Sequence, residues 1–170
     1  MKGPRAVFYS MDRRIALLLE ILDQAYDRRA WHGTPLKGSI RGVGIEQALW
    51  RPGRGRHNIW EIVLHAAYWK FIVRRRLLRE PELTFPRSGS NWFSLPPAAD
   101  ERAWKRDAAF LHEQHGLLRQ AIARFPAVRL KARAWRSTWS NEETIYGIAS
   151  HDLYHAGQIQ LLKALSRERS

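Results

Sequence analysis

The sequence TIYGIASHDLYHAGQIQLL, residues 144–162, has the composition of a buried helix. Its only formally charged residue is Asp152, in a chain where 26% of the residues are charged. A helix of this kind is buried over most of its surface. His151 and His155 are four residues apart, so they lie on one face of that helix, at the spacing that lets two imidazoles bind one metal ion. The stretch therefore predicts a core helix with a candidate pair of metal ligands.

The composition of the whole chain narrows the chemistry that such a pair can serve. The chain has no cysteine, which excludes thiolate zinc sites, disulfide bonds and cysteine nucleophiles. Histidine and carboxylate remain as the strong metal ligands. Any thiol chemistry therefore requires an external thiol.

Length and hydropathy indicate one domain without a membrane span. A chain of 170 residues can bury a core without a structural metal, and we expect a single domain over residues 1–170. No apolar run is long enough to cross a bilayer, and the first residues lack the apolar segment of a signal peptide. We therefore expect a cytoplasmic protein with no membrane partner.

Lysine and arginine outnumber the acidic residues by 29 to 16, so the chain has a formal net charge of +13. A net charge of this size and sign is typical of proteins that bind nucleic acid, so nucleic acid has to be considered as a partner. The basic residues are scattered, however, and the densest cluster, Arg74 to Arg76 with Arg79, would fan around a helix instead of forming a stripe. We therefore interpret these residues as solvated surface and do not expect a nucleic-acid partner.

Four long segments repeat apolar residues at the spacing of an amphipathic helix, over about residues 10–29, 58–80, 100–125 and 140–165. Each begins at a residue that can cap a helix: Ser10, Asn58, Asp100 and Ser140, with Glu61 and Glu143 placed to complete two capping boxes. Four amphipathic helices without paired strands predict an all-α four-helix bundle. In such a bundle, inward side chains on facing helices form the natural place for a site.

Long connecting loops join these helices. Residues 36–57 are rich in glycine and predict a loop with a short helical turn near residues 45–49. Residues 81–99 combine proline with Trp92 and Phe93 and predict an aromatic loop that folds over part of the bundle. Within residues 127–139, apolar and basic residues alternate over positions 128–133, and this alternation predicts a short extended piece. Loops of this length leave the topology open.

A third histidine, His65, lies on the apolar face of the second predicted helix. Three nitrogen ligands from two packed helices would leave one or more coordination positions open, which is the pattern of a catalytic site and not of a closed structural one. Zinc and nickel suit this ligand set, as does ferrous iron, because imidazole binds several borderline ions. We therefore predict a divalent metal site at His65, His151 and His155.

Three stretches carry a resemblance to a known family: residues 31–33 (WHG), 57–69 (HNIWEIVLHAAYW) and 151–159 (HDLYHAGQI). They are similar to stretches of the DinB/YfiT-like four-helix proteins, in the branch close to the bacillithiol transferases. The family's single histidine on helix two falls on His65, and its pair on helix four falls on His151 and His155. The resemblance implies a four-helix bundle, a bound divalent ion, frequent homodimers and, in characterised relatives, transfer of a low-molecular-weight thiol to an electrophilic small molecule.

Four further residues are candidates for the surroundings of the ion. Glu61 lies one turn before His65 and could accept a hydrogen bond or act as a general base, although the capping box needs the same carboxylate. Trp69 and His115 could line a substrate pocket or pack in the core, and Gln158 could orient a bound group or pack between helices. Asp152 is rotated by about 100° from His151 and is expected to contact another helix or solvent instead of the ion.

Three functions are compatible with these residues. The leading hypothesis is an enzyme whose metal ion activates an external thiol for attack on an electrophile, and the second is a hydrolase that activates water at the same position. The third is a protein without catalysis that binds metal or contacts nucleic acid. The third hypothesis would be favoured if the affinity for nucleic acid fell strongly with salt and did not change when the histidines were substituted.

Overall fold

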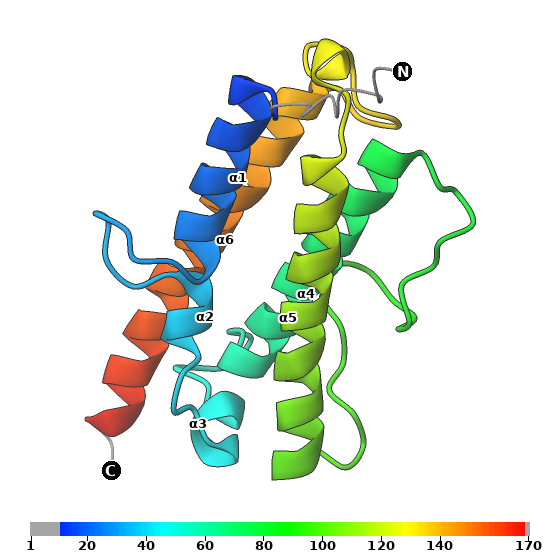
Figure 1. Ribbon diagram of the computed structural model, residues 1–170. Helices are drawn as coiled ribbons and strands as arrows, with labels where there is room; N and C mark the ends of the chain where they lie inside the picture. The colour runs from blue at the N-terminus through cyan, green and yellow to red at the C-terminus, as the bar shows by residue number, and fades with distance from the viewer. Residues whose placement is uncertain (1–10, 169–170) are drawn as a thin grey trace, which may run out of the picture.

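Four long helices form the bundle in the computed structural model, which describes residues 11–168 (Figure 1). They are α1 (Arg13–Tyr26), α4 (Ile59–Leu78), α5 (Glu101–Ala123) and α6 (Asn141–Arg167). Two short helices, α2 (Leu36–Ser39) and α3 (Ile45–Leu49), lie between α1 and α4. The expected all-α class, the four long helices and the helical turn near residues 45–49 are confirmed. No helix within the described residues combines the length and the apolar character that a membrane span needs.

Side-chain caps start three of these helices as the sequence predicts. Asn58 accepts a hydrogen bond from the Glu61 N–H at 2.9 Å, and the Glu61 carboxylate accepts from the Asn58 N–H at 3.2 Å. Ser140 and Glu143 form the same reciprocal pair at the start of α6, at 3.2 and 2.7 Å. Asp100 accepts from the backbone of α5 at 2.7 Å. Because caps depend on neighbours in the chain, they are readable from sequence.

Helix α1 differs from the expectation at both ends. Its N-cap is Asp12, which accepts from the backbone N–H of Arg14 at 2.8 Å, whereas the expected cap, Ser10, lies outside the described residues. The helix ends at Tyr26, earlier than expected. There the backbone N–H groups of both following residues bond to the carbonyl of Asp23, which closes the last turn, and Arg28 also forms an ion pair with the Asp23 carboxylate at 3.1 Å.

No strand is formed within residues 11–168, and in place of the predicted short extended piece residues 127–139 contribute one isolated antiparallel bridge, between Arg133 and Ser140. A short 3₁₀ turn covers Ala127–Arg129 instead. The Asn141 side chain, at the start of α6, donates to the carbonyls of Arg129 and Ala132 at 2.8 and 3.0 Å. Hydrogen bonds to the start of α6 therefore satisfy these carbonyls, and the pairing of the segment does not extend beyond the single bridge.

The apolar core consists of two clusters. One joins α2, α3, the first half of α4 and of α5, and the last half of α6, whereas the other joins α1 to the remaining halves of α4, α5 and α6. Three buried polar side chains lie between the clusters and are termed the polar layer: Lys70, His115 and Asp152. The Lys70 ammonium pairs with Asp152 and lies 3.4 Å from His115 Nδ1 and 4.8 Å from the centre of the Tyr26 ring. The polar layer thus links all four long helices.

The connection between α4 and α5 folds back over α4, as the aromatic content of residues 81–99 predicts. Helix α4 ends at Leu78 and is capped by Arg79, which has a left-handed backbone with φ 59°. Phe85 and Phe93 then pack on Tyr68, with ring centres 5.2 and 5.3 Å away. This anchorage places the neighbouring Trp92 over the middle of α4.

Candidate metal centre

The three predicted ligand histidines meet between α4 and α6. The Nε2 atom of His151 lies 3.1 Å from that of His65 on α4 and 3.1 Å from that of His155 on α6. Among the described residues, these three side chains form the group of histidine and carboxylate atoms that could hold a metal ion, with one ligand atom from each within 4.8 Å of the others. The structure therefore brings together residues that are 86 positions apart in the chain.

The proton positions of this cluster fit a bound cation. His65 Nδ1 lies 2.8 Å from the carbonyl oxygen of Asn91, which can only accept, so that nitrogen carries the proton and Nε2 has a free lone pair. The same holds for His155, whose Nδ1 lies 2.7 Å from Gln158 Oε1. Two lone pairs thus point at His151 Nε2, and a single proton there could satisfy only one of them.

A divalent ion satisfies all three nitrogens at once. Imidazole nitrogens bind zinc at about 2.0–2.1 Å, so two of them on one ion are separated by about 3 Å when their bonds are about 100° apart. The observed Nε2 separations of 3.1 Å match this value. The backbone carbonyl and the amide that hold the Nδ1 protons are the kind of outer partners that orient metal-binding histidines.

Burial keeps the three imidazoles neutral, which is the form that binds a metal ion. Loss of solvent, together with the neighbouring imidazoles, lowers the pKa of His151 to about 3. Burial also lowers the pKa of His155 to about 4, against the opposing effect of its hydrogen bond to Gln158. The pKa of His65 is lowered by burial as well, although its bond to Asn91 opposes this.

Metal binding at this site is expected to persist in mildly acidic solution. Protons and the ion compete for the same lone pairs, so affinity falls only when the pH drops below the pKa values of the ligands. A ligand histidine with an ordinary pKa of about 6.5 would lower metal affinity by about 30-fold at about pH 5 relative to about pH 7.5. The pKa values of about 3 for His151 and about 4 for His155 predict little loss from these two ligands. Competition with a metal-binding dye at the two pH values measures this. A loss of about 1000-fold or more would show that the imidazoles titrate normally.

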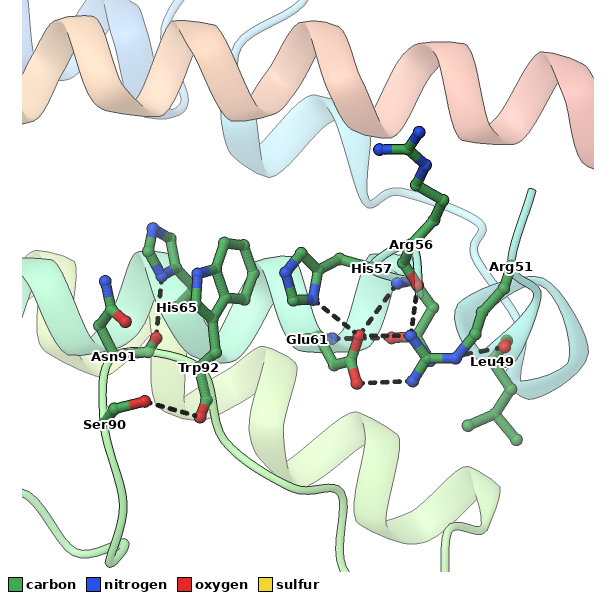
Figure 2. A network of polar contacts seen from close by, with 10 residues as sticks. Leu49, Arg51, Arg56, His57, Glu61, His65, Ser90, Asn91 and Trp92 are labelled. Carbon is green, nitrogen blue, oxygen red and sulfur yellow. Dashed lines mark hydrogen bonds and ion pairs between the residues drawn. The ribbon is translucent and has the colours of Figure 1, made fainter. Parts of the chain in front are cut away.

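Residues of the connection between α4 and α5 cover His65 on one side (Figure 2). The Trp92 indole stacks on His65 with ring centres 3.9 Å apart, and its other face stacks on His57 at 3.6 Å. Figure 2 shows Trp92 lying between the two imidazoles, with Asn91 beside His65. The loop therefore both covers His65 and supplies the carbonyl that orients it.

Glu61 is held away from the three histidines by other partners. Its two carboxylate oxygens accept from the guanidinium of Arg51 at 2.7 and 2.5 Å, and one of them lies 3.1 Å from His57 Nδ1 (Figure 2). Although partial burial has the opposite effect, the hydrogen bonds from Arg51, Asn58 and His57 hold the pKa of this carboxyl below its ordinary value. The structure thus places Glu61 in a surface network, and its predicted catalytic role has no geometric support.

The other residues singled out from the sequence lie either beside the ligand histidines or in the polar layer. Gln158 contacts the ligand His155 directly, and Trp69 makes edge contacts with His65 and His151, both with ring centres 6.3 Å away. His115 is buried in the polar layer, where it stacks on Tyr26 at 3.6 Å. Asp152 contacts another helix, as expected, through Lys70.

A cavity of about 610 Å³ opens beside the cluster, between α4 and α6. His151 and Trp69 border it at the end nearest the histidines. Its remaining wall comprises Val73, Arg76, Arg136, Ser137, Thr138, Trp139, Glu143, Thr144, Tyr146, Gly147 and Ile148. Along the cavity, moving away from the histidines, the residue numbers rise in α4 and fall in α6. The two helices are therefore antiparallel. The volume lies in the range of small-molecule sites.

Sequence reasoning missed two features of this region. The carbonyl of Asn91 has no sequence signature, because any residue could supply it. Lys70 could have been found, since it is the one formal charge in the otherwise uncharged run of residues 62–73. A lysine in such a run predicts a buried partner, which is Asp152.

An all-α bundle with three histidines on two facing helices defines a class of helical proteins with a candidate metal centre. The sequence model of the DinB superfamily matches residues 11–159, and the chain belongs to this superfamily. No curated protein and no solved structure matches the chain significantly. Membership and the three-histidine group together fit a metal-binding DinB-like protein.

Proposed function

We propose that this protein is a metal-dependent enzyme that transfers a low-molecular-weight thiol to an electrophilic small molecule, as the resemblance to the bacillithiol transferase branch implies. The observation that carries the proposal is a group of three neutral imidazoles, without a carboxylate, at the end of a cavity of about 610 Å³. A site with three protein ligands leaves a position open, as catalytic metal sites do. Zinc or nickel suits the nitrogen ligands, and iron is a further candidate.

Each residue around the cluster has a defined task in this proposal. His65, His151 and His155 would hold the ion, while Asn91 and Gln158 hold the Nδ1 protons of two of them. A divalent ion at this position supplies positive charge that lowers the pKa of a thiol or water molecule beside it. The indole of Trp92 shields His65 from solvent, and a drier site strengthens that effect.

Within residues 11–168, no carboxylate joins the histidine group, and this favours a thiol over water as the nucleophile. Among the described residues, Glu61 is engaged with Arg51 and Asp152 with Lys70, so neither acts as a base for water in this geometry. A thiol has a pKa of about 8.5 and needs much less assistance than water to lose its proton near neutral pH. In the reaction, the thiol proton passes to solvent, sulfur bonds to the electrophilic carbon, and the leaving group departs with the electrons of its bond.

The test is conjugation of a thiol to a chromogenic aryl halide by the metal-loaded protein. We expect a thioether product, identified by mass spectrometry, and loss of at least about 100-fold in turnover for His65→Ala, because a metal ligand is removed. His32→Ala, which removes an exposed histidine outside the cluster, is the matched control. Metal-dependent ester or amide hydrolysis without any thioether would favour the hydrolase instead. Equal turnover in His65→Ala would show that the cluster is not catalytic.

A further inference from the structure

The cavity beside the histidines has a cationic end as well as a metal end. Trp69, Val73 and Arg76 lie on one face of α4 and all line the cavity. The axial distance from Trp69 to Arg76 is about 10 Å, at about 1.5 Å per residue. Trp69 contacts His65 and His151, so the cavity extends from the metal ligands to the Arg76 guanidinium.

Arg76 differs from its neighbours in having no partner for its charge. Arg75 donates to the carbonyl of Leu83 at 3.1 Å, and Arg74 lies over the ring of Phe71 at 5.5 Å. Within residues 11–168, no carboxylate or carbonyl pairs with the Arg76 guanidinium, although the side chain is half-buried. Burial lowers the pKa of Arg76, which means that its charge is poorly solvated. An anion in the cavity would supply the missing partner.

The remaining cavity wall is consistent with an anion at this end. Arg136 also lines the cavity and has a left-handed backbone with φ 51°, a conformation that costs roughly 1 kcal/mol or more outside glycine and clusters at functional sites. The one carboxylate in the wall, Glu143, accepts from the backbone N–H and hydroxyl of Ser140 at 2.7 and 2.6 Å, so it is engaged by the cap of α6. The Arg136 guanidinium lies over the Trp135 ring at 4.5 Å and adds positive charge to this end of the cavity, whereas the carboxylate of Glu143 is already engaged.

We propose that the cavity binds an elongated, largely apolar carboxylic acid whose carboxylate pairs with Arg76. The apolar body lies along Trp69, Val73 and Ile148, and the opposite end of the molecule meets His151, the histidine of the cluster that borders the cavity. The span from Trp69 to Arg76 sets a length of about 10 Å for the ligand. This inference rests on the proposed function, because it assigns a substrate class to the same site. It adds a residue that selects the substrate by charge and length.

Phenylbutyrate has suitable length and charge, and phenylbutanol is its neutral counterpart. Binding of both is measured by calorimetry on the metal-loaded protein. We expect Arg76→Met to lower the affinity for phenylbutyrate by about 10-fold or more, because a charged hydrogen-bonded pair is lost. The affinity for phenylbutanol should stay within about twofold of that of the unsubstituted protein. Arg74→Met, two residues earlier on the same helix, is expected to change neither. Arg76→Lys, which keeps the charge and the long side chain, is expected to bind phenylbutyrate at an intermediate level.

Two results would overturn the inference. One is equal binding of the acid and the alcohol by the unsubstituted protein. The other is phenylbutyrate binding that survives Arg76→Met and disappears after chelation, since the carboxylate would then bind the ion and not the arginine. The thiol conjugation assay separates this inference from the proposed function. Conjugation that shows no preference for acidic over neutral electrophiles in the unsubstituted protein, and that stays unchanged in Arg76→Met, would remove the inference alone. Arg76-dependent binding without any turnover would remove the proposed function alone.

Discussion

Replacement of both His151 and His155 by alanine is expected to abolish stoichiometric binding of a divalent ion. Complete structural zinc sites contribute about 10–16 kcal/mol from four ligands, so the loss of two of three ligands should weaken binding by at least about 1000-fold. The one remaining imidazole, His65, cannot chelate. Elemental analysis of purified protein, followed by calorimetric titration with zinc and nickel, measures the effect.

Two controls define what this result means. His32→Ala removes an exposed imidazole and is expected to retain one ion per chain. Chelated wild-type protein is expected to keep its helical circular dichroism, because two apolar clusters hold the bundle together. Its stability should fall by the linkage term, about 4 kcal/mol where the ion had been present at 1000 times its dissociation constant. Full metal occupancy in the double variant would place the ion elsewhere.

Removal of the buried carboxylate of Asp152 is expected to destabilise the fold far more than removal of a surface charge. The Asp152 and Lys70 side chains are both fully buried, and Asp152→Ala would leave the lysine charge without a counterion between the two apolar clusters. Breaking a buried pair in this way costs about 3–5 kcal/mol. Urea unfolding of metal-free protein, followed by circular dichroism, measures the loss without a contribution from the ion.

A surface pair and a double variant test the physical cause. Lys105→Ala breaks the exposed ion pair with Glu101 at 3.3 Å and is expected to cost less than about 1 kcal/mol. Replacing both members of the buried pair, as Lys70→Met with Asp152→Leu, should recover much of the loss, because no charge is then left unpaired. An Asp152→Ala protein as stable as wild type would mean that Lys70 is neutral or reaches solvent.

Local sequence patterns were sufficient to predict the four long helices and the histidine cluster, but not the short helix α2 or the ends of α1. Asn58 and Ser140 start α4 and α6 through bonds to backbone groups within three residues, so the relevant partners are neighbours in the chain. His151 and His155 share a helix face for the same reason, since helical spacing alone brings them together. The placement of His65 opposite them needed one further step, that apolar faces of facing helices meet.

Tertiary packing decided the features that depend on partners remote in sequence. The spacing of four residues between Glu61 and His65 suggested a shared task, yet Arg51 reaches across from the preceding loop and binds the carboxylate. The extended piece expected at residues 127–139 is reduced to one isolated bridge between Arg133 and Ser140, because carbonyls of that segment bond to the Asn141 side chain at the start of α6. Neither partner, Arg51 for Glu61 or Asn141 for the carbonyls, belongs to a periodic sequence pattern. Neither contact could therefore be predicted from the sequence.

The sequence therefore determined which side chains could bind an ion, and packing determined what surrounds them. Helical periodicity is a property of consecutive residues, so His65, His151 and His155 could be selected without coordinates. Their orientation by Asn91, and the cavity that ends at Arg76, arise where a loop and two antiparallel helices meet. Such contacts depend on distances between segments that are far apart in the chain, and the free energy of packing the whole bundle sets those distances.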